Sequence, residues 1–516
     1  MPREDYTSRV PFERLISARN GYTVCAGEIT LHSRYDPMLE AEKYIDSLRP
    51  EKSYRYFILI EPALGYLALA LKRRFPQSGL VILHCSDFFS NEKLSALWPE
   101  NIGSRIAVKA PSWNPSCKES LENFLDRTIG TAEPAEIRLI DWKPSVNAYG
   151  KSCVDLAART VDCIRRIAAG KNTVKNFGRR WLRNALRNLP LLRNPAEFRA
   201  GVQPVLVCAA GPGLEDSLPA IAEWKQSAAP PFIIAVSSAA PAMLYRKIIP
   251  DIIVAVDGGP WALLHLFESF RSIKNPDKCP VIAAALTASL PSQTENWPIL
   301  ILGDGSLWQE LLLRSCNKLP FKSFPQRGTV SASALDLALL LTGGNIYFAG
   351  LDFSHQDIKT HSRPYAFDKI LENTSSRYKP LYSLTFEREV TISKSGSLGI
   401  YAAWFKTHVN HAAPGRLYTL MSSPLGIPQA ELPLKGGTES GKAAEITFTV
   451  NRNFSPPGKK NGAVLLLDAL DAPLTAKQTE QELGELLFPD FSTQDGDLSG
   501  KLKKALTEIA HGQANV

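Results

Sequence analysis

The chain has 516 residues, of which 44% are hydrophobic and 21% charged, with 33 glycines and 37 prolines. This ordinary globular composition fits roughly three domains and excludes a small module, a collagen-like chain, a coiled coil and a wholly disordered chain. The net charge of +8, from 59 Lys and Arg against 51 Asp and Glu, favours anionic partners only where the basic residues cluster.

The eight cysteines are scattered with no C-x-x-C pair, which excludes a disulfide framework or a zinc ribbon and predicts reduced, mostly buried thiols. Residues 1–21 carry charges throughout and no apolar run, so no secretory signal is predicted. No segment approaches the ~18–20 apolar residues that a membrane span requires. We therefore expect a cytoplasmic protein without a membrane span.

Residues 1–150 are expected to form a small N-terminal α/β domain. Short apolar runs at 54–60, 79–84, 105–108 and 137–142 predict strands, and the segment after the first run has apolar residues at helical spacing. This alternation predicts a parallel sheet. The first strand-to-helix turn reads EPALGYLA, which is a weak phosphate cradle, so we interpret the domain as a scaffold.

Residues 151–200 are expected to form a basic helical linker. They lack strand patterning, and apolar residues interleave with basic ones up to Pro190, which predicts one or two amphipathic helices. Such a stripe fits nucleic acid, an acidic sugar donor, a protein partner or simply a solvated face between two domains. No nucleic-acid motif accompanies it, so nucleic acid is not an expected partner. The basic residues are Arg165, Arg166, Lys171, Lys175, Arg179, Arg180, Arg183, Arg187, Arg193 and Arg199.

Residues 201–365 are expected to form a central, doubly wound, Rossmann-like domain, followed by a mainly helical region at 366–516. Six apolar strand runs alternate with helices between 204 and 350. In such a sheet, ligands bind beyond the carboxyl ends of the strands, near the switch in strand order. The candidate site is therefore sought among the residues that follow the strands.

The strand ends carry small residues, hydroxyls and carboxylates, which are the groups that a polar pocket needs. The turn Gly211-Pro212-Gly213 precedes a helix and is expected to offer free backbone N–H groups to a phosphate. It lacks the G-K-[ST] of a Walker loop and the full dinucleotide-binding motif. The other strand ends read Ser237-Ser238, Asp257-Gly258-Gly259, Gly303-Asp304-Gly305 and Gly350-Leu351-Asp352.

Two acids and two histidines stand out near these ends. Asp257 and Asp352 each follow an apolar strand, where an aspartate either caps a turn or faces a ligand. His355 and His361 follow in a polar loop, and a loop histidine can act as an acid or base near pH 7. Asp352, Asp357 and these histidines could together hold a divalent cation, but no tight metal-binding spacing supports one, so no metal ligand is assigned.

The order of VLVCAAGPGLEDSLPAI, then IIPDIIVAVD, then FAGLDF followed by TH resembles the Maf (motility accessory factor) flagellin glycosyltransferases. Their central domain is shared with the archaeal 6-hydroxymethylpterin diphosphokinases (MptE-like proteins). Its fold is similar to that of bacterial sialyltransferases that use CMP-linked nonulosonic acids. The resemblance is good over 201–365 and extends to the preceding basic segment and α/β domain. Nothing beyond 430 resembles the family.

The resemblance implies roles for particular residues. Asp257 and Asp352 match the family's strand-end acids, and His361 matches its T-H histidine, so these three are the candidate catalytic residues. Gly213 stands where serine is usual, and Leu351 where glutamine is frequent. The candidate donor-binding residues are Gly211, Pro212, Gly213, Leu214, Ser237, Ser238, Thr329 and Gly350.

The function implied is an inverting glycosyltransferase. It would move a nonulosonic, sialic-acid-like sugar from CMP to Ser or Thr of flagellin, as flagellar assembly and motility require. A strand-end carboxylate or His361 would take the hydroxyl proton. No cofactor is firmly expected, and a divalent cation is possible. Two alternatives stay open: a 6-hydroxymethylpterin diphosphokinase-like transferase, and a non-catalytic flagellin-binding accessory protein, which the departures at Gly213 and Leu351 keep open.

Overall fold

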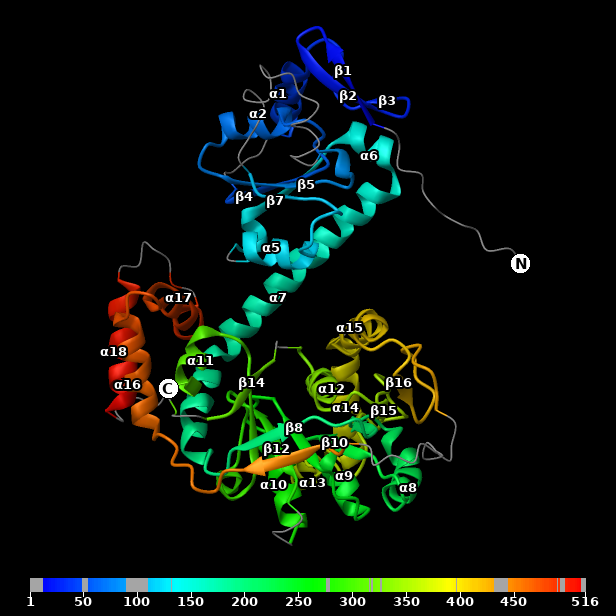
Figure 1. Cartoon of the computed structure of the whole chain (residues 1–516), viewed down its shortest axis with the longest axis vertical. Coiled ribbons are helices and arrows are strands. Elements are labelled where there is room, and N and C mark those ends of the chain that lie inside the picture. Colours follow the sequence, from blue (N-terminus) through cyan, green and yellow to red (C-terminus); the bar gives the residue numbers. More distant parts are fainter. Residues whose placement is uncertain are drawn as a thin grey trace, which may run out of the picture. The chain divides into compact units, whose positions relative to one another are not determined.

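The chain divides into two compact units, Met1–Thr173 and Val174–Val516, which are described separately (Figure 1). The computed structural model describes residues 13–48, 54–89, 110–130, 132–274, 279–314, 316, 319–324, 327–395, 397–430, 444–489, 491 and 497–511. The strand expected at 105–108 lies outside these residues.

The first unit is built around the expected parallel sheet. Its strand order is β6-β5-β4-β7, and the buried runs of β4 and β5 fill its centre. An antiparallel sheet, β1-β2-β3, precedes it and was not predicted. The elements are β1 (Glu13–Ala18), β2 (Gly21–Ala26), β3 (Ile29–Thr30), α1 (Pro37–Ser47), β4 (Tyr56–Ile60), α2 (Tyr66–Arg74), β5 (Gly79–Leu83), β6 (Ser112–Trp113), α5 (Leu121–Ile129), β7 (Ile137–Asp141) and α6 (Lys143–Tyr149).

The second unit contains an eight-stranded, wholly parallel sheet in the order β14-β13-β12-β11-β10-β9-β15-β16. The six predicted strands are present, and two short edge strands, β14 and β16, add to them. The strands are β9 (Val205–Cys208), β10 (Phe232–Val236), β11 (Ile252–Ala255), β12 (Val281–Ala285), β13 (Ile299–Gly303), β14 (Phe321–Ser323), β15 (Ile346–Ala349) and β16 (Leu417–Thr419). A two-stranded antiparallel sheet pairs β8 (Ala196–Arg199) with β17 (Thr447–Val450).

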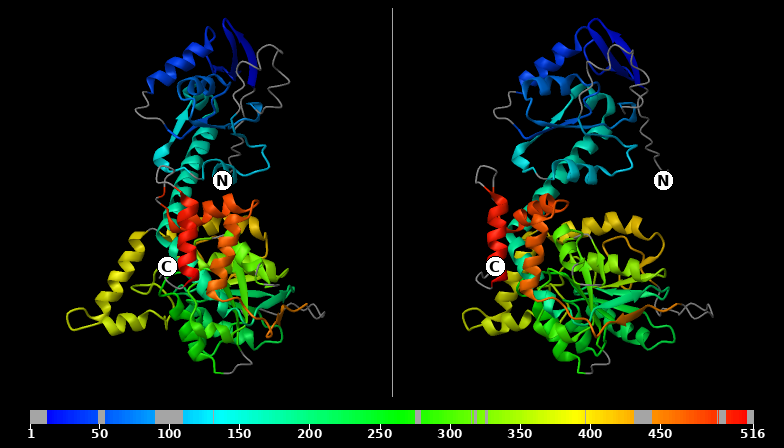
Figure 2. Two further views of the ribbon diagram at one scale, coloured as in Figure 1. Left: turned by 90° about the vertical axis from the view of Figure 1, so that its left-hand side faces the viewer. Right: turned by 60° about the vertical axis from the view of Figure 1, so that its left-hand side comes forward.

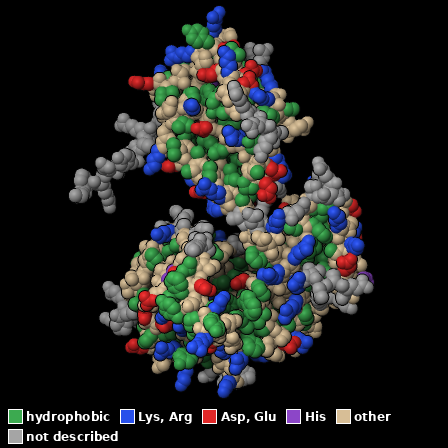
Figure 3. Space-filling model, turned by 180° about the vertical axis from the view of Figure 1, so that it is seen from behind, with side chains coloured by type: hydrophobic (Ala, Val, Ile, Leu, Met, Phe, Trp, Pro, Cys, Tyr) green, Lys and Arg blue, Asp and Glu red, His purple; other side chains and the backbone are tan. Residues whose placement is uncertain are grey.

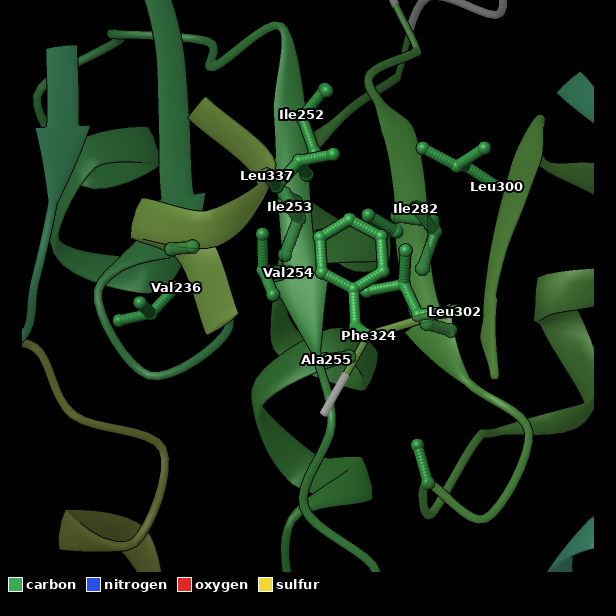
Figure 4. Close-up of a cluster of buried hydrophobic side chains, with 14 of the residues drawn as sticks. Val236, Ile252, Ile253, Val254, Ala255, Ile282, Leu300, Leu302, Phe324 and Leu337 are labelled. Carbon is green, nitrogen blue, oxygen red and sulfur yellow. The ribbon is translucent and has the colours of Figure 1, made fainter. Parts of the chain in front are cut away.

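The central strands are apolar along their whole length because helices or loops cover both faces of a parallel sheet. Every residue of β9, β10 and β11 is buried. Figure 4 shows part of this core, where Val254 and Ile282 from neighbouring strands lie close to Phe324 and to Leu337 of a covering helix. The predicted Rossmann-like fold is confirmed.

The strand order reverses between β9 and β15, which makes the carboxyl ends of these two strands the switch point of the sheet. Right-handed crossovers place α8 (Leu214–Lys225), α9 (Ala240–Tyr245) and α10 (Leu263–Ser272) on one face and α12 (Val330–Leu341) on the other (Figure 1). Helix α12 contacts β9, β10 and β11.

The C-terminal region is mainly helical, as predicted. Helices α13 (Asp368–Thr374), α14 (Leu381–Ser395) and α15 (Ser397–Ala412) follow β15, and β16 then returns to the sheet. Helices α16 (Lys459–Asp471), α17 (Ala476–Leu487) and α18 (Leu498–Ala510), orange to red in Figure 2, pack against one another, and α16 and α17 also contact α11 (Leu307–Arg314).

The basic segment forms one helix, α7 (Lys151–Asn188), which begins in the first unit and ends in the second. Leu182, Leu186 and Leu189 are fully buried in the core of the second unit. Arg179 donates from Nε to the Leu487 carbonyl at 2.9 Å, so this basic residue serves internal packing. Arg183 is exposed. On the face that Figure 3 shows, basic and acidic side chains of the second unit are interspersed.

The eight cysteines are free thiols, five of them buried. Over the described ranges, no helix is both long enough and apolar enough to cross a membrane.

Candidate functional site

The candidate site lies at the carboxyl edge of the sheet, where β9 and β15 end side by side. Gly211 donates its backbone N–H to the Gly350 carbonyl at 2.8 Å, which ties the two strand ends together. The polar loop after β15 folds back over β9, because Ser362 donates to the Ala210 carbonyl at 2.9 Å. The sequence directed attention to the strand ends in general, and the structure shows that these two are neighbours.

Asp352 occupies the turn between β9 and α8. Its Oδ2 accepts the Gly213 N–H at 2.6 Å. A Cβ atom added at Gly213 would lie 2.8 Å from Asp352 Oδ1, and one added at Gly211 would overlap Oδ2. Only glycine therefore fits at positions 211 and 213, because any side chain there would displace the Asp352 carboxylate.

The expectation of free N–H groups in this turn is wrong for the structure as it stands. The Gly211 and Gly213 N–H groups donate to Gly350 and Asp352, and the Leu214 N–H donates to the Gly211 carbonyl at 3.0 Å. Pro212 has no N–H to offer. A phosphate would have to replace Asp352 at Gly213 or bind beside it, so the turn's first role is to position that carboxylate.

Burial raises the pKa of Asp352, and the negative charge of Asp216 adds to this, while the hydrogen bond from Gly213 acts in the opposite direction. Within the described part of the chain, Asp352 Oδ1 has no hydrogen-bond partner. Asp352 thus combines a fixed orientation, an available oxygen and a basicity above that of an ordinary carboxylate, which are the properties of a general base.

His361 is held in the same loop. Its Nδ1 lies 2.9 Å from Thr360 Oγ1, and its ring stacks on Tyr365 with centroids 4.3 Å apart. Glu215 at the start of α8 anchors the loop by accepting from Lys359 Nζ at 3.1 Å and from the Arg363 N–H at 2.7 Å. Burial, followed by the positive charge of a nearby arginine, lowers the pKa of His361 to about 3. The imidazole is therefore neutral at pH 7 and a weak proton acceptor.

The strand-end aspartates differ in what they contact. Asp257 is exposed, and its Oδ1 accepts the Gly259 N–H at 2.7 Å. Burial raises the pKa of Tyr365 and of Tyr401, and the charge of Asp257 adds to both shifts, so both rings lie within its field. Asp304 instead accepts from the N–H and hydroxyl of Ser306, just before α11, and from the Gln309 side chain within that helix, so it holds the turn that leads into α11.

The remaining predicted residues flank this edge. Ser237 is buried and its N–H donates to the Val254 carbonyl at 2.8 Å, whereas the neighbouring Ser238 is partly exposed. Thr329 is the N-cap of α12, but its side chain makes no capping hydrogen bond. A Cβ at the preceding Gly328 would lie 3.7 Å from the Tyr401 ring. Thr329 and Tyr401 are therefore close to each other.

The cation cluster that the sequence left open, with Asp352, His355, Asp357 and His361, does not assemble. His355 turns toward α14, where its Nε2 lies 2.9 Å from Ser393 Oγ. In the part of the chain that the structure describes, no three His, Cys, Asp or Glu side chains converge in a way that could hold a metal ion.

Sequence reasoning missed four residues near this edge. Arg388 of α14 and Tyr401 of α15 come from helices outside the predicted domain, and His265 and Tyr365 pack against each other with centroids 5.0 Å apart. Burial lowers the pKa of His265 to about 4, and Arg388 contributes. The only available signal was the aromatic run around Tyr365 in RPYAFD, which also fits a core segment.

These features define a Rossmann-like domain with a polar switch-point site. The sequence model of the family described as "6-hydroxymethylpterin diphosphokinase MptE-like" matches residues 180–357. The chain therefore carries an MptE-like domain, and the resemblance predicted from the sequence is confirmed for it. Asp257 and Asp352 lie inside the match, whereas His361, Tyr365 and Arg388 lie beyond its end.

Two curated relatives are uncharacterized proteins of Treponema pallidum (strain Nichols). One is 28% identical over 352 residues, which is 64% of this chain and 72% of the relative. The other is 26% identical over 401 residues, 74% of this chain and 65% of the relative. A solved Maf glycosyltransferase from Magnetospirillum magneticum AMB-1 is similar with a TM-score of 0.47 and 13% identity, over 98% of this chain and 86% of that one.

Proposed function

We propose that this protein is a glycosyltransferase that moves a nonulosonic acid from a CMP-linked donor to Ser or Thr hydroxyls of flagellin in the cytoplasm. The observation that carries the proposal is Asp352, a partly buried carboxylate of raised pKa fixed by Gly213 at the switch point of an MptE-like domain. The motif order that resembles the Maf glycosyltransferases favours this donor and acceptor.

The proposed chemistry is an inverting displacement. The acceptor hydroxyl attacks the anomeric carbon, the bond from that carbon to the phosphate oxygen breaks, and CMP leaves with the bond's electron pair. Asp352 takes the hydroxyl proton. His361, with its low pKa, is better suited to accepting a hydrogen bond and forming a wall of the site than to proton transfer. The dipole of α8, whose N-terminus lies at the turn, and hydroxyl groups at this edge would stabilise the charge that develops on CMP.

The test uses the full-length protein with CMP-N-acetylneuraminate and flagellin, followed by intact-mass analysis of the flagellin. A mass increase that requires Asp352, and fails with Asp352→Asn, supports the proposal. Calorimetry with CMP and with ATP accompanies this assay. If neither nucleotide binds and flagellin stays unmodified, the remaining function is that of a flagellin-binding accessory protein.

A diphosphokinase is the second candidate, because the matching family bears that name. It would pass a diphosphate from ATP to the hydroxymethyl group of a pterin. The test incubates the same protein with ATP and Mg²⁺, with and without 6-hydroxymethyl-dihydropterin. AMP release that depends on the pterin favours the kinase, and no AMP release favours the glycosyltransferase.

A further inference from the structure

Arg388 stands out among the charged groups at the switch-point edge. Its guanidinium lies over the Tyr365 ring at 4.7 Å and near the Phe367 ring at 5.5 Å from their centroids. The side chain is partly buried. Across the described residues, no carboxylate lies within ion-pair distance of it. Asp368, which feels its charge, is instead 3.7 Å from Arg363.

The rings that pack around Arg388 are uncharged at neutral pH, and Asp368, the carboxylate that its charge influences, lies beyond ion-pair distance. His361 stacks on Tyr365, and His265 stacks on Phe367 with centroids 4.7 Å apart. His265 is 5% exposed, and its Nδ1 has no hydrogen-bond partner. We call Arg388, Tyr365, Phe367, His265 and His361 the Arg388 cluster. The cluster carries the positive charge of Arg388, and the two histidines stay neutral because their pKa values are lowered.

The Arg388 cluster adjoins the Asp352 turn. His361 precedes Ser362, whose N–H donates to the Ala210 carbonyl directly before Gly211. On the other side, Asp257 lies near enough to Tyr365 to influence its titration. A ligand at the carboxyl ends of β9 and β11 would therefore meet the cluster.

Arg388 donates a hydrogen bond to the Tyr365 side chain, and the remaining N–H groups of its planar fork suit a carboxylate or a phosphate. A partly buried cation without a counter-ion is also incompletely stabilised until an anion arrives. We propose that Arg388 binds an anionic group of the substrate, either the carboxylate of a sugar acid or the phosphate of a nucleotide. The inference rests on the proposed function and names the residue that selects an anionic donor.

Three probes separate the two sources in calorimetry on the full-length protein. CMP carries a phosphate without a carboxylate, N-acetylneuraminate carries a carboxylate without a phosphate, and cytidine carries neither. Arg388→Gln should weaken one anionic probe about tenfold to a hundredfold, as expected for a hydrogen bond to a charged group, and leave cytidine unchanged. A selective loss for neuraminate assigns the carboxylate, and a selective loss for CMP assigns the phosphate.

Two variants guard the interpretation. Arg388→Lys keeps the charge but loses the fork, and it should bind with intermediate strength, which also serves if Arg388→Gln folds poorly. Arg314→Gln, which removes an exposed arginine paired with Glu310 on α11, should bind every probe as the parent does. Parental affinity of Arg388→Gln for both anions, or no binding of either anion by the parent, overturns the proposal.

The outcome is separable from that of the proposed function. If anions bind through Arg388 but flagellin is never modified, the glycosyltransferase activity fails and the anion site stands. If flagellin is modified and Arg388→Gln keeps the parental KM for the CMP-sugar, the activity stands and the role of Arg388 fails.

Discussion

The two units each contain a doubly wound parallel sheet, and a carboxylate closes one strand end in both. In the first unit, Glu61 after β4 is fully buried. It accepts the Cys85 N–H at 2.8 Å and the Ser86 N–H at 3.2 Å, and its other oxygen lies 2.9 Å from His84 Nδ1. In the second unit, Asp352 accepts one N–H and leaves an oxygen without a partner among the described residues.

The difference lies in how completely each edge satisfies its own polar groups. Glu61 uses both oxygens internally, and it does so with a φ of 42°, a backbone conformation that is strained for a residue other than glycine. Among the residues that the structure describes, the second edge retains a carboxylate oxygen of Asp352 and the Nδ1 of His265 without hydrogen-bond partners, and Arg388 without a carboxylate at ion-pair distance. A parallel sheet therefore has a fully hydrogen-bonded edge in the first unit and an edge with available polar groups, the candidate site, in the second.

The largest effect is expected for Asp352→Asn. The substitution keeps the size and removes the proton acceptor, so flagellin modification should fall by about 10²–10⁴-fold while CMP binding is largely retained. Intact-mass analysis of flagellin over time measures it. Asp304→Asn is the matched control, because that strand-end aspartate only holds the turn before α11, so the substitution should leave the rate of the folded enzyme unchanged. Full modification by Asp352→Asn would remove this residue from the mechanism.

Glu61→Ala should produce the opposite pattern. It leaves the His84 ring and the N–H groups of Cys85 and Ser86 without their hydrogen-bond partner, so it should destabilise the first unit by about 3–5 kcal/mol. Urea unfolding measures this loss, with the exposed Glu28→Ala as control. CMP binding by the folded variant should equal that of the parent. Weaker CMP binding without loss of stability would mean that the first unit is more than a scaffold.

Acid should destabilise the second unit through His265 and His361. Burial lowers their pKa values to about 4 and about 3. The unfolded chain, with a histidine pKa near 6.5, binds protons first as the pH falls, so stability is lost on acidification. Between pH 6.5 and pH 5 each histidine should cost about 2 kcal/mol. Urea unfolding at both pH values, compared with His265→Gln and His361→Gln, tests this. An equal pH dependence in parent and variants would contradict it.

The smallest effect is expected for Gly213→Val. The new side chain would collide with Asp352 and stand where a donor phosphate would approach the turn, so donor binding should weaken by about 1–3 kcal/mol. CMP calorimetry on the folded variant measures it. Affinity equal to that of the parent would show that the turn does not support the donor.

Much of this fold could be predicted because buried parallel strands are written as uninterrupted apolar runs. The runs IIVA and ILILG have this form, whereas β14 (FKS) and β16 (LYT) are three-residue edge strands whose polar residues hide them. The antiparallel β1-β2-β3 sheet was missed because β1 is partly exposed and carries two charged residues, and because β3 has only two residues.

The candidate site was predictable only where strand ends define it. The sequence identified Gly211 and Asp352 as strand-end residues, but their contact depends on the strand order, which only the structure shows. Arg388 was invisible because its neighbours read FERE, a pattern of an ordinary exposed helix. Only the path of the loop at 361–367, which brings Tyr365 and Phe367 beneath the guanidinium, gives that arginine a place at the edge.

Helix α7 has a practical consequence for dissecting the protein. Asn184 donates to the Gly258 and Thr287 carbonyls, and Asn188 donates to those of Leu286 and Ala288, so the end of this helix closes the carboxyl ends of β11 and β12. A fragment that starts at residue 201 would lose these donors and expose a strip of leucines. A cloning boundary at residue 174 keeps them and is the natural starting point for expressing the second unit alone.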